Sequence, residues 1–321
     1  MRLPRLACSL LLALMAVHAA TAQTFPTKPL RIIVPFGAGG VADLTARTVA
    51  QKLGESLGQP VVIDNKPGAG GVVAGDLVAK AEPDGHTLLL MSNGTAVSAG
   101  LFKSLPFDTL RDFAPVSTLG FFDIALITPM NSKFKTLAEL LAFARANPGK
   151  LNVGTINVGS TQNLAGELFK TSSGTDVQIV PFNGTPAVIT ALRGGQIDAA
   201  VEILGPVLPQ IRAQALRALA VTGEKRAAVL PDVPTARESG LPGFVATSWN
   251  ALAVPARTPA AVIARLNRDI AAAVNTPEVK KKLAELNVEA RSGSPEQAAA
   301  LLAGDTKRWG EVITRAGIPK Q

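Results

Sequence analysis

Residues 31–43, RIIVPFGAGGVAD, decide the predicted fold of this chain. An apolar run with β-branched residues passes through a glycine-rich bend into an amphipathic stretch that opens with the carboxylate of Asp43. The first part favours a strand and the last part a helix. Such a unit aims free backbone N–H groups and the positive end of a helix at one place, and both attract an anion.

The same arrangement recurs at residues 61–81, where a second GAGG tetrapeptide follows a short apolar run and precedes a small-residue helical stretch. Two successive strand-loop-helix units predict a parallel α/β sheet. Further strands are expected at residues 87–91, 114–119, 124–128, 151–155, 178–182, 197–203, 216–222 and 245–254. Further helices are expected at residues 42–57, 137–146, 162–171 and 186–193.

The order of these elements predicts two lobes. A Pro-rich stretch at residues 230–234 ends the second α/β series, and three helix starts follow at Thr258, Thr276 and Ser294, each a capping hydroxyl before a proline. We expect residues 23–125 and 247–321 to form lobe 1 and residues 126–246 to form lobe 2. The chain would cross between them twice, and a ligand would lie in the cleft.

The first 22 residues are predicted to be an export signal, so the mature chain would be soluble and exported. Arg2 and Arg5 precede an apolar core at residues 6–17, and Ala20-Thr21-Ala22 forms a small-x-small cleavage site. The apolar core is too short to span a bilayer.

Cysteine and histidine content argues against most catalytic and metal sites. The only cysteine, Cys8, and one of two histidines, His18, fall in the predicted signal. Thiolate nucleophiles and His-rich zinc sites are therefore excluded, and a Ser-His-Asp triad would have to use His86, which is expected at the surface or an edge. We expect no metal, no cofactor and no catalysis.

The formal net charge of +8 comes from scattered basic residues, without interleaved aromatics and without any tyrosine. This pattern disfavours nucleic acid as a partner, while a mild positive field favours anions.

Three loops carry the candidate binding residues, and each has a plainer interpretation. The glycines of the first loop, residues 36–40, permit either a tight turn or close approach of a ligand, and Asp43 is either a cap or an organiser of that loop. In the second loop, residues 155–161, Ser160 or Thr161 is either an N-cap or a ligand contact. In the third loop, residues 182–186, Thr185 is expected to cap a helix, and Asn183-Gly184 forms either a turn or part of the site.

Glu202, near the end of an apolar strand, is expected either at the cleft wall or as an edge charge in water. The complete candidate set is Phe36, Gly37, Ala38, Gly39, Gly40, Asp43, Thr155, Asn157, Gly159, Ser160, Thr161, Phe182, Asn183, Gly184 and Glu202.

An enzyme interpretation uses the same first loop. Residues 37–42 satisfy the pattern G-x-G-x-x-A, and Asp64 ends the next strand where a ribose-binding acid belongs. Pro35-Phe36 interrupts the junction of strand and glycines, and an exported protein does not normally meet a dinucleotide pool. An exported dinucleotide-dependent oxidoreductase is therefore the disfavoured alternative.

The chain resembles the substrate-binding proteins of tripartite tricarboxylate transporters, the bacterial Bug receptors, over essentially its whole mature length. The matching stretches, in residue numbers, are 29–36 with Gly39, Gly40 and Asp43, then 65–71, 83–89, 112–116, 159–160, 164–169, 180–184, 230–235 and 253–259.

The resemblance implies a type II periplasmic-binding-protein fold, an α/β fold of two lobes joined by a double-crossover hinge. It implies a monomeric periplasmic receptor that closes around a small carboxylate, held by backbone amides and ordered waters without an arginine. The partners would be that carboxylate and the membrane subunits of a transporter, or a sensor in place of the transporter. The chain departs from the family pattern at Gly37-Ala38, where Pro-Pro is usual, at Asn163 (commonly His), at Phe182 (commonly Tyr) and at Glu202 (often Asp).

Overall fold

The structure is a computed structural model, and it describes residues 25–315 and 317–320. The predicted signal peptide, residues 1–22, lies outside the described residues. Within these ranges, no helix combines the length and the apolar character that crossing a membrane requires.

Ten strands are present in the described part of the chain, and eight of them follow one another across a continuous sheet. Their bounds are β1 (Leu30–Val34), β2 (Val61–Asn65), β3 (Thr87–Ser92), β4 (Phe113–Pro129), β5 (Leu151–Ile156), β6 (Val177–Phe182), β7 (Ala199–Ile203), β8 (Leu216–Val221), β9 (Thr247–Pro255) and β10 (Val288–Ala290).

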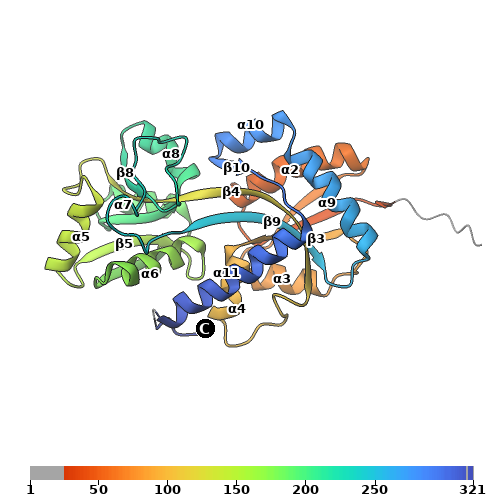
Figure 1. The fold of residues 1–321 in the computed structure, drawn as a ribbon, viewed down its shortest axis with the longest axis horizontal. Coiled ribbons are helices and arrows are strands. Elements are labelled where there is room, and N and C mark those ends of the chain that lie inside the picture. Colours follow the sequence, from red (N-terminus) through yellow and green to blue (C-terminus); the bar gives the residue numbers. More distant parts are fainter. Residues whose placement is uncertain (1–24, 316, 321) are drawn as a thin grey trace, which may run out of the picture.

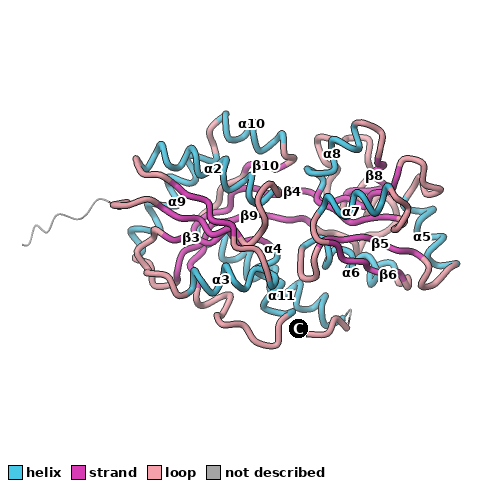
Figure 2. The backbone as a smooth tube through the Cα atoms, turned by 180° about the vertical axis from the view of Figure 1, so that it is seen from behind, coloured by secondary structure: helices cyan, strands magenta, loops and turns pink. Residues whose placement is uncertain are grey.

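Helices alternate with these strands and cover the faces of the sheet (Figures 1 and 2). The helices are α2 (Val41–Leu57), the short 3₁₀ helix η1 (Ala69–Gly71), α3 (Val72–Ala79), α4 (Asn93–Leu101), α5 (Leu137–Ala146), α6 (Thr161–Ser173), α7 (Thr185–Arg193), α8 (Leu204–Arg212), α9 (Ala260–Val274), α10 (Pro277–Glu285) and α11 (Pro295–Arg315).

The strand pairing divides the molecule into two lobes. In lobe 1, β2, β1 and β3 are parallel, and β9 and β4 continue the sheet antiparallel to their neighbours. In lobe 2, β7, β5 and β6 are parallel to one another, and β4 pairs antiparallel with β7 and β8. Each lobe is thus an α/β unit with parallel strands whose carboxyl ends lead into helix starts.

Strand β4 runs through both lobes, and with β9 it joins them (Figure 1). It pairs with β9 from Phe113 to Asp123 and with β7 from Ile124 onward. The chain returns to lobe 1 at Thr247, which lies opposite Asp123. The two crossings are therefore adjacent, which is the arrangement a hinge requires.

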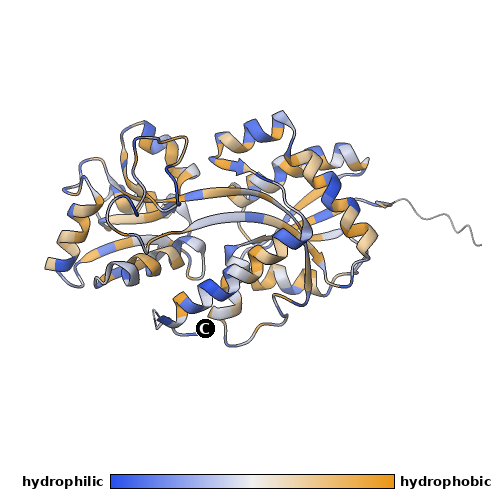
Figure 3. Cartoon of the chain, viewed as in Figure 1, coloured by the Kyte–Doolittle hydropathy of each residue, from blue (hydrophilic) through white to orange (hydrophobic). Residues whose placement is uncertain are grey.

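The C-terminal helix α11 packs along both lobes, against α4, β4 and α6. Hydrophobic and hydrophilic residues alternate along it (Figure 3). Its buried residues Trp309, Val312 and Ile313 join a cluster that also contains Leu101 of α4 and Leu164 of α6. One apolar core thus contains side chains from lobe 1, lobe 2 and the C-terminal helix.

The structure corrects two expectations about local structure and adds two helices. Residues 114–119 and 124–128 form one strand, β4, whose irregularities near Pro115 and Gly120 are bulges. Helices α4 and α8 were not expected; α8 contains Pro209. The N-cap of α9 is Pro259 rather than Thr258, whereas Thr276 caps α10 as expected.

Candidate functional site

The first loop, residues 36–40, links β1 to α2 and is held by a buried polar cluster. Asp43 accepts hydrogen bonds from the Gly39 amide (2.9 Å), from Arg47 Nε (3.0 Å) and from Asn65 Nδ2 (2.9 Å). Asn65 also donates to the carbonyl of Phe36 (3.0 Å). Asp43 is 2% exposed, so the carboxylate organises this loop and lies beneath it.

Its partners keep Asp43 ionised. Burial alone would raise the pKa of this carboxyl, but hydrogen bonds from Arg47, the Gly39 amide and Asn65 outweigh burial and hold the pKa below its ordinary value of 3.8. A carboxylate with a lowered pKa in the folded state stabilises the fold above the ordinary pKa. That contribution is lost as the pH falls through the lowered pKa.

Asp43→Ala is expected to lower the free energy of unfolding by about 3 kcal/mol, because the substitution leaves the Gly39 amide and Asn65 with unpaired donors. The loop should also lose its fixed shape, so ligand affinity should fall. Urea unfolding and calorimetry measure the two effects. Arg47→Ala is the matched control: it removes the partly exposed cation but keeps the carboxylate. Equal effects of the two substitutions would contradict the organising role of Asp43.

The second loop, residues 155–161, is organised by Asn163, which was not among the predicted site residues. Its Nδ2 donates to Thr155 Oγ1 (3.2 Å), and its Oδ1 accepts from the Gly159 amide (3.3 Å). Its own amide donates to Ser160 Oγ (3.1 Å), the N-cap of α6. Thr155 is fully buried and bound to Asn163, so its hydroxyl positions this loop.

The start of α4 brings the first and second loops together. A Cβ on Gly94 would lie 3.8 Å from Cζ of Phe36 and 4.0 Å from the carbonyl oxygen of Gly159. Gly94 is in the first turn of α4, and its amide donates to the N-cap Ser92. Gly159 packs closely on α4: a Cβ added to it would lie 2.7 Å from Cδ2 of Leu101. The loops that precede α2 and α6 therefore meet at the start of α4, where lobe 1 contacts lobe 2.

Glu202, near the end of β7, connects the first turn of α6, which follows the second loop, to the third loop, residues 182–186. Its Oε2 accepts from Thr185 Oγ1 (2.9 Å) and Gln162 Nε2 (3.4 Å). Thr185 is the first residue of α7, whose N-cap is Gly184, so the expected capping role of Thr185 is wrong. Glu202 is fully buried, so the edge charge in water is wrong as well.

A buried chain of hydrogen bonds links lobe 2 to the crossing strand β9. Thr161 Oγ1 lies 3.3 Å from Ser248 Oγ, which donates to Asn93 Oδ1 (3.2 Å). Asn93 Nδ2 donates to Asp305 Oδ2 (3.1 Å), which also accepts from Trp249 Nε1 (2.6 Å). The first turns of α4 and α6 are thereby fixed to one another and to α11.

The other predicted site residues lie within these loops. Gly37, Ala38, Gly40, Asn157 and Asn183 are exposed and Phe182 is half-buried.

Two further side chains, His86 and Asp64, bear on the enzyme alternatives. His86 is buried, packs on Phe25 and accepts from the Thr27 amide, so its expected surface position is wrong. Asp64 is ion-paired with Arg31 and Lys66, which occupies the carboxylate that a dinucleotide would use.

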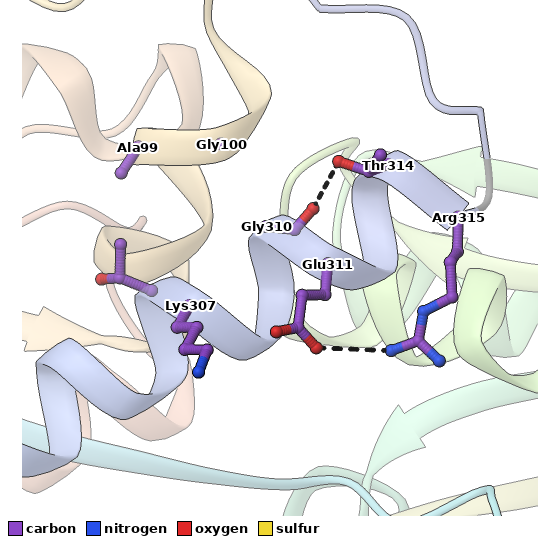
Figure 4. Close-up of a pocket in the computed structure, with 8 residues that line it drawn as sticks. Ala99, Gly100, Lys307, Gly310, Glu311, Thr314 and Arg315 are labelled. Carbon is purple, nitrogen blue, oxygen red and sulfur yellow. Dashed lines mark hydrogen bonds and ion pairs between the residues drawn. The ribbon is translucent and has the colours of Figure 1, made fainter.

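A groove of about 600 Å³ between α4 and α11 contains none of the predicted site residues (Figure 4). It passes over Gly100 and Gly310 and is bordered by the ion pair of Glu311 and Arg315. Within residues 25–315 and 317–320, no group of three or more acidic, histidine or cysteine side chains is arranged to hold a metal ion.

Two α/β lobes, two adjacent crossing strands and loops from both lobes that meet at the start of α4 define a two-lobe solute-binding protein. A model of the tripartite tricarboxylate transporter family receptor matches residues 45–318, and the chain belongs to this family. The predicted family and the predicted two-lobe fold are thereby confirmed.

Three similar proteins each cover 90% or more of the chain. Protein BugT of Bordetella pertussis is 36% identical over 317 residues, which are 96% of this chain and 97% of BugT. Rpa4515 of R. palustris, solved with adipate, superposes with a TM-score of 0.85 at 33% identity over 92% of this chain and 99% of that one. MatC of Rhodopseudomonas palustris, solved with malate, superposes with a TM-score of 0.81 at 34% identity over 90% of this chain and all of that one.

Proposed function

We propose that this protein captures a small organic carboxylate between its lobes in the periplasm and delivers it to the membrane subunits of a transporter. The observation that most supports this proposal is the structure of the first loop: Asp43 and Asn65 fix its backbone, and residues 37–40 are exposed. Neutral N–H groups at a helix start bind an anion without a fixed cation. Two relatives with similar structures hold dicarboxylates, malate and adipate.

The proposal divides the mature chain at the crossings, with residues 23–125 and 247–321 in lobe 1 and residues 126–246 in lobe 2. The contributions of lobe 1 would be Phe36–Gly40 and Asp43, and those of lobe 2 the second and third loops with Glu202. Closure of the lobes would let both sets touch one ligand. The protein would act as an exported monomer without catalysis, because its site supplies contacts that bind an anion and its one histidine outside the predicted signal lies elsewhere.

A thermal-shift panel of malate, adipate, citrate, amino acids and NAD on refolded protein tests this function. A bound carboxylate should stabilise the fold by RT ln(1 + [L]/Kd), about 2.7 kcal/mol at a hundredfold excess over Kd. Refolding removes ligand carried through purification. Stabilisation by NAD that Asp64→Ala abolishes would favour the oxidoreductase instead.

Gly39→Val should abolish the carboxylate shift, because its side chain would block approach to the loop backbone. Gly39 has φ +84°, so valine also strains the backbone. Gly58→Val is the matched control: Gly39 lies just before α2 and Gly58 is the C-cap of α2. Gly58 has φ +67° and open space where a Cβ would lie. Loss of the shift in both variants would show that strain alone is responsible.

A further inference from the structure

Glu202 is a buried carboxyl group with one unused oxygen. It lies at the carboxyl end of β7, opposite Ala125 of β4. The first turns of α6 and α7 lie against it through Gln162 and Thr185. Both donors bind Oε2. In the part of the chain that the structure describes, Oε1 is buried and has no hydrogen-bond partner.

An ionised carboxylate in this position would be costly, because a buried charge needs either a cation or a full set of donors. Within the described ranges, no lysine, arginine or histidine forms an ion pair with Glu202. A proton on Oε1 removes the charge and turns the unused oxygen into a donor.

The same burial acts on the pKa of Glu202. Burial raises the pKa of Glu202 to about 7. The hydrogen bonds from Thr185 and Gln162 oppose this effect, and so does the nearby backbone amide of Ile203. No charged group contributes to this shift. The titratable side chains on the elements packed around β7 are Asp123 of β4, Glu167 and Lys170 of α6, Arg193 of α7 and Arg212 of α8.

We propose that Glu202 is protonated in the ligand complex and that its Oε1–H donates a hydrogen bond to a carboxylate oxygen of the bound acid. This inference rests on the proposed function and deepens it. A protonated carboxyl group favours an acceptor at this point of the ligand and disfavours an ammonium group, which would need the ionised form. Binding therefore takes up a proton whenever the free protein is ionised at Glu202.

The affinity for the carboxylate should therefore fall as the pH rises. Well below pH 7 Glu202 already carries its proton and the affinity is constant. Above pH 7 the ligand must compete with deprotonation, so the dissociation constant rises tenfold for each pH unit. Between pH 6.5 and pH 9, where malate and adipate are both dianions, the affinity is expected to fall about 100-fold.

Calorimetry with malate and adipate at pH 6.5 and pH 9 tests the expected loss of affinity. A separate measurement at pH 8 tests proton uptake: wild-type protein should take up close to one proton per ligand, measured from binding enthalpies in buffers of different ionisation enthalpy. Glu202→Gln carries a permanent neutral donor, so its affinity ratio between the two pH values should approach one and its proton uptake should vanish. Glu202→Leu should weaken binding at both pH values.

Glu167→Gln is the matched control, because burial also raises the pKa of Glu167 and Glu167 is not among the hydrogen-bond partners of Glu202 in the described residues. Its pH profile should equal that of wild type. Tight binding of a carboxylate with a flat wild-type profile would overturn this inference and leave the receptor function standing. An affinity that rises with pH would overturn it too, because ionised Glu202 would then accept from a ligand donor. Failure of both acids and of every other carboxylate to bind would overturn the proposed function itself.

Discussion

Gly205→Val is expected to weaken carboxylate binding by about 100-fold while both lobes stay folded. Gly205 is in the first turn of α8 in lobe 2. A Cβ at this position would overlap the backbone carbonyl oxygen of Leu286, which lies just before β10 in lobe 1. The glycine therefore allows the lobes to touch at this point.

The expected size follows from the strain in the closed arrangement. Leu286 presents backbone to Gly205, and backbone cannot rotate away as the end of a long side chain would. Overpacking of this kind costs about 3 kcal/mol, and each 1.4 kcal/mol reduces an equilibrium constant tenfold. If opening separates Gly205 from Leu286, the overlap is relieved in the open protein, so the strain reduces the population that binds ligand and leaves the unfolding of each lobe unchanged.

Calorimetry and small-angle scattering with saturating malate measure this effect. Wild-type protein should become more compact on binding, and Gly205→Val should keep the dimensions of the free protein. Gly304→Val is the matched control, because Gly304 is also helical and has open space around its Cα. Wild-type affinity in Gly205→Val would show that binding does not require the contact between Gly205 and Leu286.

The parts of the fold with strong local patterns could be predicted from the sequence. Helix α2 begins and ends within one residue of its expected bounds, because its apolar stripe and the terminal glycine at Gly58 are local signals. Two strands are predicted in place of β4, because Gly120 resembles a strand end and lies at a bulge inside a long strand. Helix α8 was missed because Pro206 and Pro209 disguise its period.

In the candidate site, too, contacts between neighbours in the sequence could be predicted, whereas contacts between distant residues could not. The hydrogen bond between the first loop and Asp43 could be predicted, since the glycines and the acid lie close together in the sequence. That these loops bind a ligand stays a prediction. The contributions of Asn65 and Gly94 could not be predicted, because they depend on contacts with residues far away in the chain. For Glu202 the sequence allowed two environments, and only the packing of α6 and α7 over β7 decides for burial.

The buried carboxylate of Asp305 is the second position at which a single substitution should have a large effect. Its Oδ2 accepts from Trp249 Nε1 on β9 and from Asn93 Nδ2 on α4, and Asn93 leads through Ser248 to Thr161 of lobe 2. Burial raises the pKa of Asp305 above its ordinary value of 3.8, although Trp249 and Arg308 oppose the shift. A carboxyl with a raised pKa stabilises the fold most below the ordinary pKa, and that contribution is lost as the pH rises through the raised value.

Asp305→Ala is expected to lower the free energy of unfolding by about 4 kcal/mol, because two buried donors, on Trp249 and Asn93, lose their acceptor. Asp305→Asn keeps an acceptor oxygen and should cost less. It should also gain stability relative to wild type as the pH rises from 4, since the wild type alone pays for a buried charge. Urea unfolding at several pH values measures both effects. Asp232→Ala, at an exposed aspartate, should change stability by less than about 0.5 kcal/mol. A similarly small effect of Asp305→Ala would mean that water replaces the lost acceptor, and the chain of contacts from α11 to Thr161 would then not hold the two lobes together.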